Sequence, residues 1–168
     1  TGARAPRPPT PHPRGAAGAG RYTAPGQHAS WLTPPLRAIT LCLPTRATWE
    51  PGQYALVRVA PYQWRPYSLA TPSGRIVRLL VDTRTGGHGA AWATHAAPTD
   101  VVSRELPYGH FLFFFYDWET NEFYTPRRRR IFVATGTGIA PFLAEFEQGL
   151  RADDVLLLGL ATTSEDPT

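Results

Sequence analysis

The stretch Arg65-Pro66-Tyr67-Ser68-Leu69-Ala70 is the part of the sequence from which the organisation of the chain can be worked out. In a strand, Arg65 and Tyr67 project from one face, with Ser68 on the other side or at a kink. The guanidinium of an arginine is a rigid fork of donors that suits a phosphate, and a tyrosine offers a flat π surface and a hydroxyl. Taken alone, the stretch is equally compatible with an ordinary edge strand.

Two glycine motifs follow it. Gly86-Gly87-His88-Gly89 precedes residues 89–97, a small-residue run compatible with a helix. Glycines there let backbone N–H groups approach a pyrophosphate, and the helix N-terminus adds a favourable field. Gly136-Thr137-Gly138-Ile139-Ala140-Pro141 joins an apolar run to a helical pattern, where glycine permits close approach of a ligand to the backbone. The structural alternatives are a glycine loop that caps a helix and a plain strand–turn–helix corner.

Short β-rich runs separated by turn signals surround the first two motifs. Such spacing predicts an antiparallel barrel or sandwich. The six predicted strands are Leu36–Leu43, Gln53–Ala60, Arg65–Thr71, Arg75–Thr83, Asp100–Leu106 and His110–Tyr116.

A different pattern follows the polar residues 117–126. Ile131–Thr135 predicts a strand, Pro141–Leu150 is apolar along one helical face, and Val155–Leu160 is typical of a buried parallel strand. This strand–helix–strand order predicts the start of a doubly wound domain. With only two strands, we expect an exposed apolar edge along residues 155–160, and with it poor solubility or self-association.

The net charge of +4 belongs to the first 30 residues, which hold four arginines and no acid, whereas residues 31–168 hold 13 Arg and 13 Asp and Glu. This balance argues against a nucleic-acid partner. Residues 1–30, rich in Pro, Gly, Ala and Arg, are predicted to be a disordered tail, with Pro8-Pro9-Thr10-Pro11 as an alternative ligand for an interaction domain. Arg127–Arg130 is interpreted as a solvated linker run, or else as a patch for a phosphate or an acidic partner.

The cysteine count, the histidine spacing and the hydropathy pattern argue against a disulfide-rich protein, an iron–sulfur protein, a metal site and a membrane-spanning protein. Cys42 is the single cysteine, so the chain has no intrachain disulfide framework and cannot hold an iron–sulfur cluster by itself. His88 and His95 are seven residues apart without a carboxylate set, so no metal site is predicted. No apolar run approaches the roughly 20 residues of a membrane span and no export signal is visible, so a cytoplasmic location is expected.

In this order and spacing, the three motifs resemble those of the ferredoxin–NADP reductase family, over residues 36–168. Pro107-Tyr108-Gly109-His110-Phe111 also matches the family's pattern at the end of its barrel. The resemblance implies a β plus α/β fold: an antiparallel six-stranded flavin-binding β-barrel, followed by the first β-α-β of an incomplete Rossmann-like nucleotide-binding domain. The expected domains are the tail at 1–30, the FAD-binding barrel at 31–125 and a partial NAD(P)-binding domain at 126–168.

The resemblance also implies the site. Arg65 would hold the flavin phosphate, Tyr67 would pack on the flavin ring, and Ser68 would lie near flavin N5, so that Tyr67 and Ser68 form the catalytic pair. The other residues implied to bind FAD are Pro66, Val81, Thr83, Gly87, His88, Gly89 and Ala90. Those implied to bind the nicotinamide nucleotide are Gly136, Thr137, Gly138 and Pro141.

The implied function is that of an FAD-dependent oxidoreductase, which transfers a hydride between NADPH or NADH and the flavin and passes electrons to an iron–sulfur or haem protein. Two departures keep an alternative open, that of a flavin-binding module or incomplete fragment without NAD(P)H turnover. Gly159-Leu160-Ala161 lacks the Arg or Ser of the family, and the sequence stops before the remaining strands and helices. The choices between NADH and NADPH and between FAD and FMN, and the identity of the acceptor, also stay open.

Overall fold

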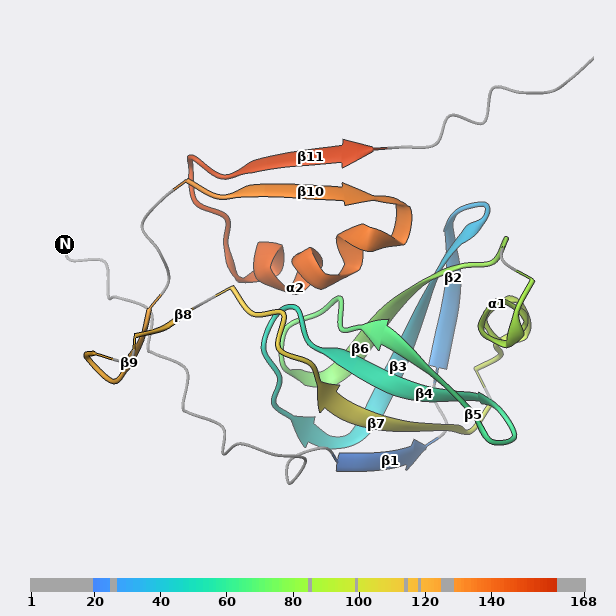
Figure 1. Ribbon diagram of the computed structural model, residues 1–168. Helices are drawn as coiled ribbons and strands as arrows, with labels where there is room; N and C mark the ends of the chain where they lie inside the picture. Colours follow the sequence, from blue (N-terminus) through green and yellow to red (C-terminus); the bar gives the residue numbers. More distant parts are fainter. Residues whose placement is uncertain are drawn as a thin grey trace, which may run out of the picture.

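The computed structural model describes residues 20–24, 27–84, 86–98, 100–113, 115–117, 119–124 and 129–159. Two antiparallel sheets form one part, and a parallel strand pair with a helix forms the other (Figure 1). The strands are β1 (Gly20–Ala24), β2 (Gln27–Thr33), β3 (Leu36–Ala47), β4 (Tyr54–Ala60), β5 (Gln63–Ser68), β6 (Gly74–Asp82), β7 (Val102–Tyr108), β8 (Phe115–Asp117), β9 (Glu122–Tyr124), β10 (Ile131–Thr135) and β11 (Val155–Gly159). The helices are α1 (His88–His95), the 3₁₀ turn η1 (Gly136–Ile139) and α2 (Ala140–Gln148).

The antiparallel part consists of a four-stranded sheet in the order β1-β7-β4-β5 and a three-stranded sheet in the order β2-β3-β6. Alternate residues of these strands face one shared core, as the twofold repeat of a strand requires. Its fully buried members include Ile39, Leu41, Val57, Val77 and Leu79. In the described residues the ladders form two separate sheets, so the closed six-stranded barrel stays a prediction.

Five of the six predicted antiparallel strands are confirmed as β3 to β7, with small shifts of their ends. The sixth, His110–Tyr116, is wrong, because residues 110–113 are not in a strand and only the short β8–β9 hairpin follows. Tertiary packing overrides the β propensity of this run, since Phe111 and Phe113 pack their rings against Phe142 at 5.9 and 5.8 Å.

Part of the segment predicted to be disordered is ordered. Residues 20–24 form β1, which pairs with β7, and β2 begins at residue 27 and pairs with β3. Tyr22 packs on the core and Arg21 forms an ion pair with Glu105, so partners distant in sequence stabilise a segment that has little pattern of its own. The interpretation of Pro8–Pro11 falls outside the described residues.

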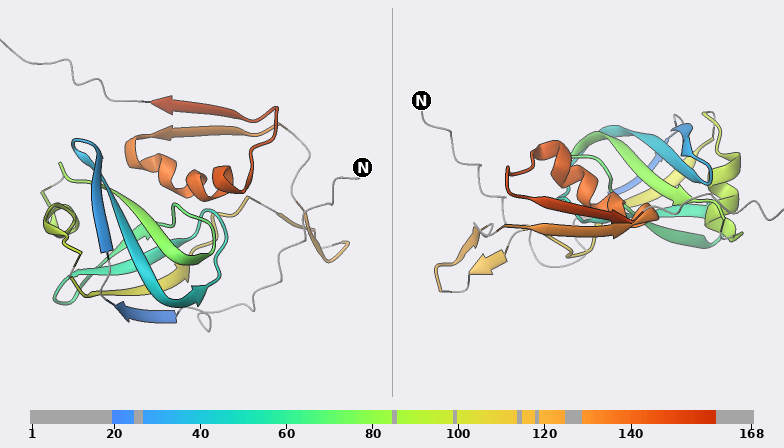
Figure 2. Two further views of the ribbon diagram at one scale, coloured as in Figure 1. Left: turned by 180° about the vertical axis from the view of Figure 1, so that it is seen from behind. Right: turned by 90° about the horizontal axis from the view of Figure 1, so that it is seen from above.

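The predicted strand–helix–strand order is confirmed. β10 and β11 pair in parallel, with Ile131 opposite Val155, and η1 and α2 connect them. Helix α2 lies between this strand pair and the antiparallel sheets, as the views in Figure 1 and from behind (Figure 2, left) show. Phe132 and Phe142 are buried between strand and helix.

The other face of the pair is open. Ile131, Val133 and Leu157 expose 62%, 65% and 55% of their surface, so this face is an apolar strip without a cover among the described residues. Within the described part of the chain, no helix has the length and apolar character needed to cross a membrane.

Arg130 fastens the start of β10 to the start of β11. Its Nε and Nη2 donate to Asp154 Oδ1 and Oδ2 at 3.0 and 2.6 Å, and Nη1 bonds Glu145 on α2. This guanidinium lowers the pKa of the buried Asp154 carboxyl to about 2. The arginine predicted to belong to a solvated run is thus a structural residue.

Asp154→Asn should lower the free energy of unfolding at pH 7 by about 1.5–3 kcal/mol, because a charge-assisted pair is lost. The folded pKa of Asp154 lies below its unfolded value, so its contribution is complete above about pH 4 and disappears as the pH falls towards 2. Urea unfolding between pH 2 and 7 should therefore show a shallower acid dependence for the variant. The exposed neighbour provides the control Asp153→Asn, and an unchanged acid slope in Asp154→Asn would contradict the assignment.

Trp49 is the largest fully buried side chain, and it joins the turn after β3 to the turn before β6. Its Nε1 donates to the Thr71 carbonyl at 2.7 Å, while its backbone exchanges hydrogen bonds with the Ser73 hydroxyl at 2.9 and 2.6 Å.

Trp49→Phe should destabilise the fold by about 2–3 kcal/mol, because it leaves the buried Thr71 carbonyl without its donor and opens space in the core. Thermal and urea unfolding measure the loss. Tyr62→Phe, at a position that is 97% exposed, should change stability by less than about 0.5 kcal/mol. Equal effects of the two substitutions would show that the indole is not a structural anchor.

Candidate functional site

Residues of all three sequence motifs line one cavity of about 400 Å³. Four elements supply its walls: strand β5, strand β6, the N-terminal turn of α1, and the turn between β10 and α2. The lining residues are Arg65, Pro66, Tyr67, Ser68, Leu80, Val81, Asp82, Gly87, His88, Gly89, Ala90, Thr137 and Ala140.

The β5 wall carries the polar groups. Arg65 is exposed and donates from Nη1 to the Trp64 carbonyl at 2.9 Å. Tyr67 is half-buried, with its ring 5.8 Å from that of Trp92. Burial raises the pKa of the Tyr67 hydroxyl, against the opposing effect of the Arg65 charge, so the hydroxyl keeps its proton at neutral pH.

The α1 wall presents backbone donors. Helix α1 begins after Gly87, which has no side-chain cap, so the first N–H groups of the helix are not satisfied by a capping side chain. A Cβ atom at Gly87 would meet no atom within 4 Å, whereas one at Gly89 would overlap the Tyr67 hydroxyl. The turn is therefore open to a ligand at Gly87 and closely packed against β5 at Gly89.

The third wall comes from the turn before α2. Thr137 and Ala140 line the cavity, while Gly136, Gly138 and Pro141 do not. Gly136 has φ +51°, in the left-handed region that favours glycine. A Cβ at Gly138 would meet no atom within 4 Å, and Pro141 lies in the first turn of α2.

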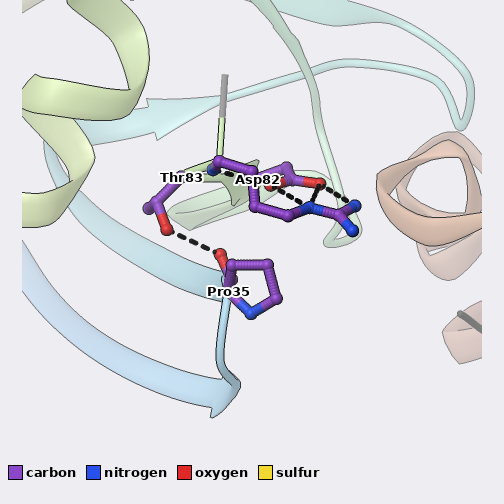
Figure 3. Close-up of polar contacts among 4 residues, drawn as sticks. Pro35, Asp82 and Thr83 are labelled. Carbon is purple, nitrogen blue, oxygen red and sulfur yellow. Dashed lines mark hydrogen bonds and ion pairs between the residues drawn. The ribbon is translucent and has the colours of Figure 1, made fainter. Parts of the chain in front are cut away.

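Of the two predicted site residues at the β6 wall, Val81 and Thr83, one lines the cavity and the other does not. Thr83 does not line the cavity, because its hydroxyl donates to the Pro35 carbonyl at 2.9 Å and its N–H donates to the same oxygen at 3.0 Å (Figure 3). Val81 does line it, together with Leu80 and Asp82, which the sequence reasoning missed. The side-chain hydrogen bond from Arg84 lowers the pKa of the Asp82 carboxyl, so this carboxyl is ionised at neutral pH and is ion-paired with the Arg84 guanidinium (Figure 3).

Leu80 and Asp82 could have been found from the twofold repeat of the predicted strand, because they occupy alternate positions along it. Ala140 could not, since its place depends on how α2 packs. It is buried in a cluster with Ala38, Ala70 and Leu80 of the antiparallel part.

His110 and the arginine run at residues 127–130 are further candidates for functional residues. His110 is exposed and does not line the cavity, and Arg129 is exposed. Arg127 and Arg128 lie outside the described residues. In the ranges that the structure describes, no three His, Cys, Asp or Glu side chains gather as metal ligands.

No family model and no curated protein matches the chain. Solved structures do. The Amycolatopsis cytochrome P450 reductase GcoB aligns with a TM-score of 0.73 and 22% identity, over 87% of this chain and 45% of that one. A ferredoxin reductase in carbazole 1,9a-dioxygenase gives 0.65 and 17%, over 88% and 53%, and phthalate dioxygenase reductase gives 0.60 and 23%, over 85% and 43%.

These matches confirm the resemblance at the level of the fold. The chain has the fold of ferredoxin-reductase-type flavoprotein reductases, and it spans about half the length of these structures.

Gly89→Ala should destabilise the cavity wall by about 1 kcal/mol, because the new methyl group overlaps the Tyr67 hydroxyl and displaces that ring. In a Tyr67→Phe background the cost should largely vanish, since the ring carbon next to the hydroxyl would be 3.7 Å from the methyl group. A double-mutant cycle of urea unfolding measures this coupling. Additive effects of the two substitutions would contradict the predicted contact.

Proposed function

We propose that this chain provides the FAD site and the first part of the NAD(P) site of an oxidoreductase of ferredoxin–NADP reductase type. One observation carries the proposal. Three motifs spread over residues 65–141 line a single cavity, in which the arginine of the first motif and the glycine turn of the second lie together. The assignment of residues 31–125 to the flavin and of 126–168 to the nucleotide is part of the proposal.

The residues present fit a phosphate. Arg65 is exposed at the cavity, and the uncapped first turn of α1 offers N–H groups in a favourable field, with open space over Gly87. Ala90 and Ala91 stand where the family has hydroxyl residues, which removes one hydrogen bond worth about 1 kcal/mol. Backbone donation from Gly87, His88 and Gly89 is unaffected by that change.

The residues also fit a flat, partly apolar ring. Tyr67, Leu80, Val81 and Pro66 supply apolar surface, and a cavity of about 400 Å³ lies within the range of ligand sites. When bound, FAD would supply the redox chemistry, taking two electrons from NADPH or NADH and releasing them singly. Tyr67 would orient the ring and Ser68 would place a hydroxyl beside its reactive edge.

The nucleotide turn completes the arrangement. Thr137 lines the cavity from a different wall than β5, and Gly138 leaves the backbone of the turn open to a ligand. Thr137 and Ser68 would therefore approach the reacting atoms from two sides, so their contribution is positional. Gly136 and Pro141 would act indirectly, by shaping the turn and starting α2.

The matched structures include a cytochrome P450 reductase and reductases of dioxygenase systems. We take the acceptor to be an iron–sulfur or haem protein in the cytoplasm. No nucleic-acid partner is proposed, because the charges of residues 31–168 balance. No metal site is proposed either.

A second candidate is a flavin-binding module without NAD(P)H turnover. The open apolar face of β10 and β11 favours it, because no described residue covers that face of the strand pair. Both candidates share the flavin site and differ only in whether the nicotinamide reaches it.

Anaerobic titration of the FAD-loaded chain with NADPH and NADH separates the two candidates. Rapid bleaching of the visible flavin band supports the oxidoreductase. A flavin that stays oxidised with both donors and bleaches with dithionite supports the module. A chain that retains no FAD contradicts both.

Arg65→Gln should raise the dissociation constant of FAD about tenfold or more, because a charged hydrogen bond to phosphate is worth about 1.5–3 kcal/mol. Quenching of flavin fluorescence measures the change. The matched control is Arg58→Gln, an exposed arginine on the paired strand β4 that does not line this cavity. Equal affinities of Arg65→Gln and the unchanged chain would remove the phosphate role of Arg65.

A further inference from the structure

Helix α1 is a short helix, and its N-terminal turn presents backbone donors to the cavity. It has eight residues, below the length at which a helix is stable by itself, and it packs through the buried Ala90 and Ala93 and the half-buried Trp92. These side chains hold one side of the helix against the core, and the carbonyl groups of its last turn, which have no intrahelical donors, are left to other contacts.

The other contacts are at its C-terminal end. Arg37 of β3 donates from Nη1 to the carbonyls of Ala93 and Thr94, and from Nη2 to the carbonyl of Ala96 at 3.4 Å. These oxygens belong to the last turn and the C-cap, where a helix has no backbone donors of its own to offer. A cation at this end also interacts favourably with the helix dipole.

Arg37 is itself held by the sheet. It pairs with Trp31 of β2 on one side and with Val81 of β6 on the other. Its guanidinium carbon lies 5.2 Å from the centre of the Trp31 ring, within the range of a cation–π contact. The position of the Arg37 guanidinium relative to the sheet is therefore fixed by the ladder and by the Trp31 ring.

Arg37 consequently connects two walls of the cavity. Val81, the ladder partner of Arg37, lines the β6 wall. The helix whose C-terminal end Arg37 caps begins with the glycine turn that forms the α1 wall. Arg37 does not itself line the cavity. It can act on a ligand only through the placement of α1.

We propose that Arg37 is a positioning residue, which sets the distance and angle between the N-terminal turn of α1 and β6 and thereby the alignment of backbone donors for a flavin phosphate. This inference rests on the proposed flavin site. It assigns a role to a residue outside the three motifs, and it makes a distinction between ligands. Flavins that carry a phosphate depend on Arg37, and riboflavin, which has the same ring without phosphate, does not.

The test compares Arg37→Gln and Arg37→Lys with Arg75→Gln. Arg75 is the matched control, since its Nε likewise donates to a backbone carbonyl, that of Leu43 at 3.1 Å, which belongs to β3 and not to α1. We expect Arg37→Gln to raise the dissociation constants of FAD and FMN about tenfold and that of riboflavin less than about twofold. Arg37→Lys should recover only part of the affinity, because an ammonium group cannot fork across three carbonyls.

Hydrogen exchange of the chain without flavin provides the second readout. Arg37→Gln should speed exchange in α1, including the Ala91 amide that bonds the Gly87 carbonyl, while Arg75→Gln should not. Unchanged exchange in α1, or equal weakening of FAD and riboflavin, would overturn the inference. If the unchanged chain binds no flavin, the proposed function fails, and the exchange result still decides whether Arg37 holds the helix.

Discussion

The arrangement of the whole molecule depends on one close contact between small side chains. Ala140, at the start of α2, is buried against Ala38 and Ala70 of the antiparallel part, together with Leu80. Methyl groups at three of these positions let the helix and the sheets approach closely, in the way that small residues permit elsewhere. Without that approach, Thr137 would not reach the cavity that β5 and α1 form.

A ring cluster supports the same junction from the other side of α2. Phe111 and Phe113, in the loop after β7, contact Phe142, which in turn contacts Phe132 of β10. Residues predicted to extend a sheet thus join the two parts of the fold. The small-residue contact sets the separation of the parts, and the ring cluster adds aromatic contacts between them.

The sequence predicted elements whose signals are local. Glycine turns, a proline at a helix start and the twofold repeat of strands identified β3 to β7, α1 and the strand–helix–strand unit. They also identified most of the cavity, because Arg65, Tyr67 and Ser68 follow from one strand. Residues whose roles depend on distant partners could not be found in this way. The Thr83 hydroxyl donates a hydrogen bond to the carbonyl of Pro35, 48 residues away. Arg21 of β1 bonds Glu105, 84 residues away.

The arginines illustrate the same division. The chain has no lysine, so every side-chain cation is a planar fork. Arg130 bonds two carboxylates, and Arg37 bonds three carbonyls of α1. Arg104, 1% exposed, donates to the carbonyls of Val102 and Cys42, and burial lowers the pKa of its guanidinium. Among the arginines that the structure describes, only Arg65 combines an exposed charge with a place on the cavity, and neither composition nor net charge separates it from the others.

The apolar strip of Ile131, Val133 and Leu157 bears on the abundance of the protein in a cell. Its side chains lie side by side on a parallel strand pair, and none of the residues that the structure describes covers them. Exposed apolar surface of this kind marks either an interaction site or a liability to aggregation, and aggregated chains are lost from the functional pool. The abundance of this chain therefore depends on how quickly that strip is covered, as well as on the stability of the core beneath it.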